Sequence, residues 1–490
     1  MPGDGTRPRN DVRDDQEEIM KHPTQNAIPE PGSLDGPIAH APSRHTVLDS
    51  PYAWYALIVM TGTCALSYID RQLLNLLVDP VRHSLRISDT QLSLVHGAAF
   101  VAAYLIAVPL FGRLADTANR RNVLVAGIGA WSLFTALCGL ADSYEKLFAL
   151  RFCVGASEAC VIPVCYSLIA DHFSTRHIQR AVSIFHVAPL FGSGFSLLAG
   201  GAVFMLAGEM RTWLPILNPL ATWQMAFVLI GLPGLLVAAV VGLTVREPAR
   251  QQMRHSAAGD RTYSLRETTA FIWLHRGFYV RIYLGIGMLA MMVLGMPAWL
   301  PTFLVRVHGA ARATVGFNFG LVVIVFATVG TLIGPWVSAA VFEKRGYVDA
   351  PLRTAAWSIV GAVFCCAAIP FMPDMRGTLA ITAAAVFFYS LPTGVMAATL
   401  QLGTPGRMRG TVGALYSLCG QLIGFGLGPT TIALVTDKVF KDPNSVGYSI
   451  AIVCPIASIV ASWLLFTALR HYRALLQATG QHGGEPPRRI

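Results

Sequence analysis

The sequence predicts an all-α integral membrane protein with twelve transmembrane helices arranged as two six-helix bundles. Three observations support this fold class. The 490 residues are 54% hydrophobic and only 13% charged, whereas soluble domains carry about 25% charged residues. The mean hydropathy is +0.53. Apolar runs of about 20 residues, the length that crosses a bilayer, recur along most of the chain.

The expected helices follow from these apolar runs, which short polar loops separate. Glycine and proline are frequent within the runs, as is normal for membrane helices, because neighbouring helices satisfy the freed backbone groups. The expected spans are 52–78, 90–111, 122–141, 146–170, 180–206, 223–245, 278–304, 313–341, 353–372, 377–399, 410–436 and 447–469.

One long loop divides these spans into two sets of six. We expect residues 246–277 to form a cytoplasmic linker between an N-terminal bundle, 52–245, and a C-terminal bundle, 278–470. The arginines of this linker predict a solvated segment beside lipid head groups, and a regulatory role is the alternative. Residues 1–51 are polar and proline-rich, without the apolar stretch of a signal peptide, and predict a disordered cytoplasmic tail. Residues 471–490 predict a second cytoplasmic tail.

Lysine and arginine are unequally distributed between the two sides of the membrane. With the spans assigned, most of the 37 lie in loops and tails on the side of the N-terminus. Positive charge accumulates in cytoplasmic loops, so we expect a multi-pass protein of the inner (plasma) membrane with both termini in the cytoplasm. The same distribution accounts for the net charge of +10, and no nucleic-acid partner is expected.

The cysteines and glycines give no sign of a cofactor. All 9 cysteines fall within expected spans, and none shows the spacing of metal ligands. They are interpreted as small apolar side chains packed between helices. No glycine-rich phosphate-binding loop follows a strand-like segment. We therefore expect neither a metal nor a bound cofactor.

Two adjacent charges, Asp70 and Arg71, interrupt the first apolar run. A charge near the bilayer centre costs at least about 2.5–3.5 kcal/mol, so such a residue faces the bundle interior or a cavity. Span four carries Arg151 and Glu158 on one helix face, about 10 Å apart along the axis. Span one runs outward and span four inward, which places Asp70 and Arg151 at similar depth and Glu158 about two turns deeper. Because Arg71 is adjacent to Asp70, we expect it to point elsewhere, toward a neighbouring helix or an outer vestibule.

The loop between spans two and three reads Gly112-Arg-Leu-Ala-Asp116-Thr117-Ala-Asn-Arg120-Arg121. We expect Gly112 to allow close approach of helices. We expect Asp116 to accept hydrogen bonds at a neighbouring helix N-terminus and to pair with Arg120. Gly112, Asp116, Arg120 and Arg121 are therefore predicted to form a cytoplasmic gate, with a solvated turn as the alternative.

These motifs resemble those of a known family. The 112–121 loop resembles the G-x-x-x-D-R-x-x-R-[KR] signature of the major facilitator superfamily, with Thr117 in place of the usual arginine. The resemblance extends over about 52–470 and implies the major facilitator fold. Further segments resemble the bacterial spinster-like branch: Tyr68-Ile-Asp70-Arg71-Gln, Arg151-x3-Gly155-x2-Glu158-Ala, Arg246-Glu247-Pro248, Trp299-Leu-Pro301 and Gly424-Phe-Gly426-Leu-Gly428-Pro429.

The resemblance implies that Asp70, Arg151 and Glu158 carry proton coupling and gating. Burial favours the protonated form of a carboxylate, and a nearby arginine favours its charged form. A carboxylate that gains and loses an arginine contact as the bundles rock would therefore exchange protons with alternating sides. A static buried ion pair is the alternative for these residues.

A substrate site is expected near the membrane midplane, where the two halves meet. Polar side chains there would meet the polar parts of a substrate, although each can instead serve only as a hydrogen bond between helices. His186 can in addition titrate near neutral pH. The candidate cavity residues are Arg71, Tyr68, His186, Trp299, Tyr389 and Gln421.

The sequence therefore predicts a transporter rather than an enzyme, because its histidines are scattered instead of clustered as a catalytic set. The expected activity is proton-coupled secondary active transport of a small organic or amphipathic, lipid-like substrate by alternating access. An organic-anion/proton symporter for aromatic or sugar acids is one alternative, and a non-transporting membrane sensor is an alternative of another class. The expected partners are a small-molecule substrate, protons and the lipid bilayer, and we expect a monomer.

Overall fold

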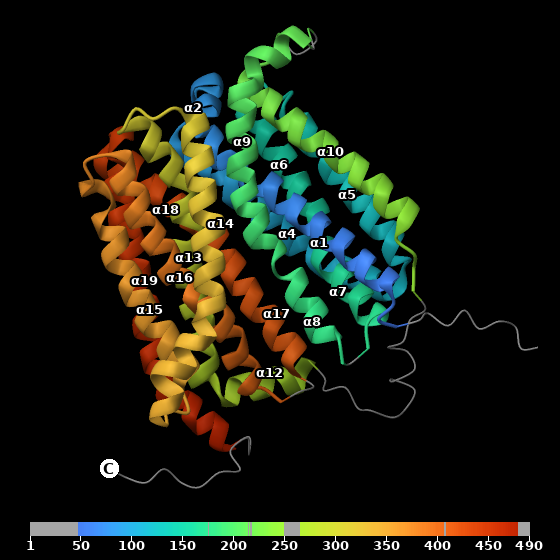
Figure 1. Ribbon diagram of the computed structural model, residues 1–490, viewed down its shortest axis with the longest axis vertical. Coiled ribbons are helices and arrows are strands. Elements are labelled where there is room, and N and C mark those ends of the chain that lie inside the picture. The colour runs from blue at the N-terminus through green and yellow to red at the C-terminus, as the bar shows by residue number, and fades with distance from the viewer. Residues whose placement is uncertain are drawn as a thin grey trace, which may run out of the picture. The chain divides into compact units, whose positions relative to one another are not determined.

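The computed structural model describes residues 48–174, 176–213, 215, 218–248, 265–405 and 408–478, and each regular element within them is helical (Figure 1). Residues 48–248, the first half, contain α1 (Pro51–Gln72), α2 (Leu74–Leu85), α3 (Asp89–Ser93), α4 (Ala99–Thr117), α5 (Arg120–Cys138), α6 (Tyr144–Glu158), α7 (Val161–His172), α8 (Ile178–Phe185), α9 (Ala188–Trp213) and α10 (Thr222–Thr244). Residues 265–478, the second half, contain α12 (Leu265–Leu274), α13 (Arg276–Arg306), α14 (Arg312–Val337), α15 (Ala350–Ala368), α16 (Met375–Leu402), α17 (Arg409–Cys419), α18 (Gly428–Leu434) and α19 (Val446–Ala478).

Several consecutive helices continue one another as one long apolar segment. Only Leu73 separates α1 from α2, and its φ of −54° and ψ of −40° are themselves helical. Short π-helical stretches make two further joins, Leu94–Ala98 before α4 and Gly420–Leu427 before α18. Such turns are frequent at functional sites. The two stretches lie against each other, because the rings of His96 and Phe425 have centroids 5.1 Å apart.

Within the described residues, 10 helical segments are long and apolar enough to cross a membrane. The prediction of an all-helical, multi-pass membrane protein is therefore confirmed. The remaining predicted spans, 180–206 and 377–399, fall on α8 with α9 and on α16. The candidate spans are Pro51–Leu85, Asp89–Thr117, Arg120–Cys138, Tyr144–His172, Thr222–Thr244, Arg276–Arg306, Arg312–Arg345, Ala350–Phe371, Thr411–Phe440 and Pro443–Gln477.

Polar caps fix where helices begin. Ser88 Oγ accepts a hydrogen bond from Gln91 N, and Gln91 Oε1 accepts one from Ser88 N, which forms a reciprocal capping box at α3. Asn119 Oδ1 accepts from Asn122 N at the start of α5. These bonds satisfy backbone donors that a helix start leaves free. The second cap also places Arg120 in the first turn of α5.

The two halves meet along α9 and α14, where glycines allow close contact. A Cβ atom on Gly320 would lie 2.8 Å from Gly194 O, and one on Gly316 would lie 2.6 Å from Leu197 O. Membrane helices approach this closely only where side chains are small. Apolar residues of both halves, including Leu77 of α2, also belong to one buried cluster. The junction is thus a packed interface between distant parts of the sequence.

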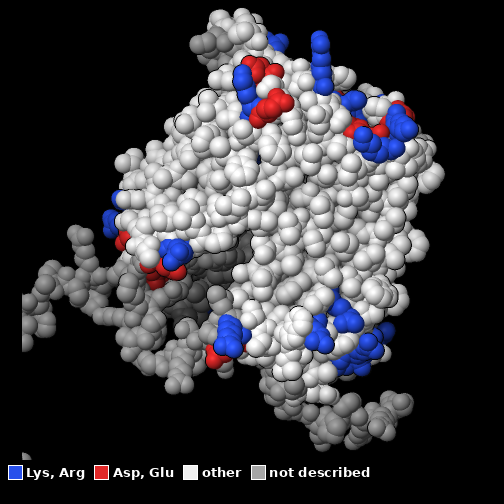
Figure 2. All heavy atoms as spheres, turned by 180° about the vertical axis from the view of Figure 1, so that it is seen from behind, with Lys and Arg blue, Asp and Glu red and all other residues white. Residues whose placement is uncertain are grey.

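The helices run between two ends, which we distinguish by their loops. The linker end, toward the bottom and the right of Figure 1, holds residues 118–119, 173–174, 176–177, 245–248 and 403–405. The far end, at the top, holds residues 86–88, 139–143, 307–311 and 441–442. In Figure 2 charged side chains gather in groups at the top, the bottom and the left edge, around a broad uncharged area. The same face has a hollow in its lower half.

Parts of the expected organisation lie outside the described residues. These are residues 1–47 of the predicted N-terminal tail, residues 249–264 of the predicted linker and residues 479–490 of the predicted C-terminal tail. Within the linker range the structure adds a helix, α12, and α19 continues to Ala478, beyond the predicted end at 470.

Candidate functional site

The buried charges of α1 and α6 form two ion pairs. Arg151 Nη1 lies 3.3 Å from Asp70 Oδ1, and these residues are 0% and 2% exposed. Thr135 Oγ1 of α5 also donates a short hydrogen bond to Asp70 Oδ2. The structure therefore brings Asp70 and Arg151 together, as their depths in the membrane predict.

Arg71 makes the second pair, with Glu158. Its Nη2 lies 2.9 Å from Glu158 Oε2, which also accepts a hydrogen bond of 3.3 Å from Ser67 Oγ. Arg71 points toward a neighbouring helix, as the sequence predicts, but the sequence does not predict Glu158 as its partner. Successive residues of a helix point about 100° apart, so Asp70 and Arg71 leave α1 in different directions. The long arginine side chain spans the difference in depth to Glu158.

Aromatic rings of both halves surround the Arg71 guanidinium. Its Cζ lies 4.7 Å from the ring centroid of Tyr68, 4.3 Å from that of Phe100 and 5.7 Å from that of Tyr104. The ring of Phe425, on the π-helical stretch of the second half, is 5.8 Å away. A desolvated cation over aromatic faces gains about 2 kcal/mol or more. Arg71 is thus held where the two halves meet.

The cluster retains polar atoms that no described residue satisfies. Arg71 Nε, Arg151 Nε and Nη2, Glu158 Oε1 and His96 Nε2 are buried without a hydrogen-bond partner among the described residues. With neither water nor ligand as a partner, each such atom would cost roughly 1–3 kcal/mol. A cluster built only for stability would be expected to satisfy them, because buried ion pairs are weak stabilisers even when fully hydrogen-bonded. Glu158 Oε1 and His96 Nε2 can accept a proton, whereas the arginine N–H groups can donate only to a polar ligand.

The structure separates the candidate cavity residues into groups. Gln421 lies within hydrogen-bonding reach of the Tyr68 hydroxyl and so joins the surroundings of Arg71. His186 is exposed, and its Nε2 lies 2.7 Å from the hydroxyl of Tyr166.

Trp299 and Tyr389 are instead buried, Trp299 at the junction of the halves, where it lines a small cavity with Leu74 and His96, and Tyr389 among apolar side chains. They are 2% and 4% exposed, and both belong to the large apolar cluster. Trp299 Nε1 donates a hydrogen bond of 2.9 Å to Pro429 O. In this conformation Trp299 joins α13 to α18 rather than facing an open cavity.

Arg120 is the centre of the predicted gate at the linker end. Its Nη1 donates to Asp171 at the end of α7, and its Nε lies 2.7 Å from Glu247 Oε1 beyond α10. Further hydrogen bonds reach Ser167 Oγ at 3.1 Å and Pro248 O at 3.0 Å. One buried guanidinium therefore ties three helix ends of the first half together.

Two expectations about this gate are wrong. Asp116 is exposed and makes no ion pair with Arg120 among the described residues, because Arg120 turns inward to Asp171 and Glu247. A Cβ atom on Gly112 would meet nothing within 4 Å, so Gly112 mediates no close helix approach in this conformation. Arg121 contributes its backbone N–H to Glu247 Oε2 at 2.9 Å, while among the described residues its side chain hydrogen-bonds to Asn122 alone.

A second ionic network, missed by the sequence analysis, joins the two halves at the far end. Arg306 of α13 lies 2.8 Å from Asp79 Oδ1 of α2 and 2.7 Å from Asp89 Oδ2 of α3. It also donates to Pro443 O at 3.0 Å. The three side chains are almost completely buried. Arg306 is therefore a buried ionic link between the halves.

A further polar contact reinforces this link. Asp437 Oδ2 accepts hydrogen bonds from Thr90 N at 2.7 Å and from Thr90 Oγ1 at 2.6 Å. The sequence signal for the network was weak, because charges at span ends are ordinarily solvated. The sequence places Asp79 and Asp89 in the loop between the first two predicted spans and Arg306 just after the predicted end of span seven, which does not pair them.

Comparison with known proteins agrees with this architecture. The family model described as Major Facilitator Superfamily matches residues 60–429. An "MFS-type efflux pump" of Mycolicibacterium smegmatis is 24% identical over 434 residues, 86% of this chain and 94% of that protein. "Protein spinster homolog 1" of Mus musculus is 25% identical over 430 residues, 84% of this chain and 78% of that protein.

Solved structures share the fold at lower identity. A bacterial homologue of the human lysosomal transporter spinster, in an inward-facing and unoccupied conformation, aligns with a TM-score of 0.72 and 21% identity, covering 89% of this chain and 100% of that one. A nucleoside transporter aligns with a TM-score of 0.63 and 11% identity, covering 84% and 99%.

Proposed function

Because this chain belongs to the Major Facilitator Superfamily of transporters, we propose that it is a proton-coupled secondary transporter that works by alternating access. The observation that carries the proposal is the buried group of four charges, Asp70, Arg71, Arg151 and Glu158, with its unpaired polar atoms. Structural ion pairs alone do not require atoms left without partners. A site whose side chains change partners during a cycle leaves some polar atoms unpaired in each state.

In the proposed cycle Asp70 and Glu158 are the proton sites, and Arg151 and Arg71 compete with the proton for them. While an arginine contacts a carboxylate, the charged form of that carboxylate is favoured. When the bundles rock and the contact lengthens, the carboxylate binds a proton from the side that is then open. Restoring the contact releases the proton. Arg71 is the residue most directly sensitive to this motion, because Phe425 of the second half lies beside it.

The far-end network supports an inward-open assignment for this conformation. Arg306 links Asp79 to Asp89, and Thr90 hydrogen-bonds to Asp437, across the two halves at that end. Alternating access closes one side of the membrane while the other is open. We assign the linker end to the cytoplasm, in agreement with the positive charge of its loops.

The wider architecture of the proposal follows the family plan. It comprises twelve spans in two six-helix bundles, 52–245 and 278–470, with the tails and the 246–277 linker in the cytoplasm. The protein is proposed to act as a monomer in the plasma membrane. The helices that are long and apolar enough to cross a membrane support insertion as a multi-pass protein.

For the substrate we propose a small organic or amphipathic, lipid-like molecule. Aromatic rings around a buried arginine offer apolar contact beside a positive charge, which suits an amphipathic molecule with a polar or anionic group. The family and the relatives named as an efflux pump and as spinster proteins support transport, and the proposed substrate class rests on the side chains of this site. An aromatic or sugar acid, attracted to Arg71, is the second candidate, because Arg71 Nε is unpaired among the described residues.

The test uses the purified protein in liposomes with an imposed pH gradient. Lysophospholipids, aromatic acids and sugar acids are supplied in turn, and substrate flux is followed together with proton movement. We expect gradient-driven accumulation of one class, and its loss in Asp70→Asn and Glu158→Gln. Glu145→Gln removes an exposed carboxylate outside the signature loop and the buried cluster and serves as the control. Coupled flux that survives both buried substitutions would contradict the proton-coupling role, and flux without proton movement would contradict coupling itself.

A further inference from the structure

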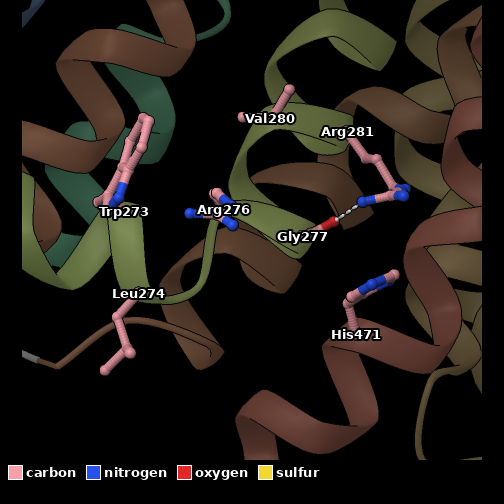
Figure 3. Close-up of a pocket in the computed structure, with 7 residues that line it drawn as sticks. All are labelled: Trp273, Leu274, Arg276, Gly277, Val280, Arg281 and His471. Atoms are coloured by element: carbon pink, nitrogen blue, oxygen red, sulfur yellow. Dashed lines mark hydrogen bonds between the residues drawn. The ribbon is translucent and has the colours of Figure 1, made fainter.

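A pocket lies at the linker end of the second half, at the corner where α12 turns into α13 (Figure 3). Its volume is about 650 Å³. The end of α19 closes one side through His471, and none of the pocket's residues belongs to the buried charge cluster. The lining residues are Trp273, Leu274, Arg276, Gly277, Val280, Arg281 and His471.

The polar part of this pocket is basic. Arg276 and Arg281 line it together with His471, and no lining residue is acidic. Arg281 Nη1 donates a hydrogen bond of 2.6 Å to Gly277 O, which holds its guanidinium over the pocket without neutralising it. His471 Nδ1 lies 3.2 Å from Thr467 O, which leaves Nε2 as the free polar atom of the ring. Neither arginine forms an ion pair with a described residue.

Gly277 lies at the centre of this arrangement and leaves room for the imidazole of His471. A Cβ atom on Gly277 would collide with the imidazole of His471. The missing side chain lets the ring pack on the backbone of α13 beside Arg281, as Figure 3 shows. The pocket is therefore built from three elements and is not a chance grouping on one helix.

The other part of the pocket is apolar and exposed. Trp273 is 70% and Leu274 is 76% exposed, and Val280 on the next turn of α13 is also exposed. The Arg276 guanidinium lies 5.1 Å from the Trp273 ring. Tryptophan concentrates where hydrocarbon meets water, and short amphipathic helices lie in that layer with their apolar residues in lipid. The position of α12, directly before a membrane span, places the pocket at this boundary.

We propose that this pocket binds the phosphate-bearing head group of an anionic membrane lipid. Figure 3 shows Arg276 extending toward Trp273 and Arg281 toward His471. The phosphate accepts hydrogen bonds from Arg276 beside the apolar residues, and Arg281 adds positive charge. A guanidinium matches phosphate geometry better than a point charge does. The acyl chains lie along Val280, Leu274 and Trp273. Basic pockets beside membrane helices on the cytoplasmic side suit such head groups. Free inorganic phosphate would use the same cations but would leave the exposed apolar residues without a role.

The test measures lipid binding to the full-length protein in detergent, by native mass spectrometry and by thermal shift. Phosphatidylglycerol, phosphatidylcholine and inorganic phosphate are added in separate series. We expect phosphatidylglycerol to be retained and to raise the melting temperature, while phosphatidylcholine and inorganic phosphate do neither. The double substitution Arg276→Gln with Arg281→Gln should weaken phosphatidylglycerol binding about tenfold or more.

Arg376→Gln is the matched control, since it removes one exposed arginine at the opposite end of the second half. Trp273→Ala keeps both arginines and should weaken lipid binding, and inorganic phosphate should still not bind. This variant tests the proposal even if the double variant fails to fold. Equal retention of the two lipids, or unchanged binding in the double variant, would overturn the proposal. If inorganic phosphate raised the melting temperature at a similar concentration, lipid binding would be contradicted and the pocket would be a site for a soluble anion. The readout does not depend on transport and is therefore separate from the proposed function.

Discussion

Arg306 and Asp89 face each other across the junction of the two halves as a bidentate pair, with Nη1 2.7 Å from Oδ2 and Nη2 2.8 Å from Oδ1. Paired hydrogen bonds of this kind fix orientation as well as adding energy. The same guanidinium reaches Asp79 through Nε at 2.8 Å. These bonds hold α13 against α2 and α3 at the far end. The halves can separate there only after Arg306 releases both Asp79 and Asp89.

Replacing Arg306 by glutamine should shift the protein toward a state open at the far end. Removing one partner of a buried ion pair costs about 3–5 kcal/mol, and here that cost falls on the closed state. A cysteine placed at buried Ser93, near this network, should then react faster with a membrane-impermeant maleimide, as measured by peptide-resolved mass spectrometry. Arg376→Gln should leave the rate unchanged. Equal labelling in the two variants would show that the network does not hold this end closed.

Arg71 and Glu158 should behave as an energetically coupled pair. Arg71→Gln leaves a buried carboxylate without its cation and should lower the melting temperature more than Glu158→Gln, which leaves the arginine over four aromatic rings. The double variant removes both charges and should regain part of the loss. Its coupling energy should be about 1–3 kcal/mol. Additive melting shifts would contradict the pairing.

Arg120 and Arg121 are neighbours in the sequence but should differ sharply when replaced. Arg120→Gln breaks contacts with Asp171 and Glu247 and should destabilise the protein by several kcal/mol, on the order of 3–5. Arg121→Gln removes a half-buried side chain whose printed bonds go to the neighbouring Asn122, and should change stability by about 0.5 kcal/mol or less. Thermal unfolding of both variants in one detergent checks this. Similar losses would show that the gate depends on the charge of the loop and not on the Arg120 contacts.

Two glycines provide a similar contrast. Gly316→Ala places a Cβ atom 2.6 Å from Leu197 O and should force α9 and α14 apart, lowering both the melting temperature and transport. Gly112→Ala meets nothing within 4 Å and should be tolerated in this conformation. Transport that fails in Gly112→Ala at unchanged stability would indicate that Gly112 is needed in another state of the cycle.

Much of the candidate site was predictable because membrane insertion makes buried charge costly. Asp70, Arg151 and Glu158 stand out in apolar runs, and helix direction sets their depths well enough to match Asp70 with Arg151. The partner of Arg71 was not predictable, because depth along the axis says nothing of how far a flexible side chain extends. The expected pairing of Asp116 with Arg120 and the expected close approach at Gly112 are not made in this conformation for a similar reason, since a short loop motif does not specify which way each side chain turns.

The sequence by itself determined the helical membrane architecture, the positions of the spans and the residues that carry buried charge. Hydropathy acts over each run of about 20 residues independently, so these features can be read without a partner helix. Only the tertiary structure decided which charges meet, that Arg306 joins Asp79 to Asp89, and that Arg276, Arg281 and His471 line one pocket. Those contacts depend on helix rotation and on packing between segments far apart in the chain, and a local pattern of residues specifies neither.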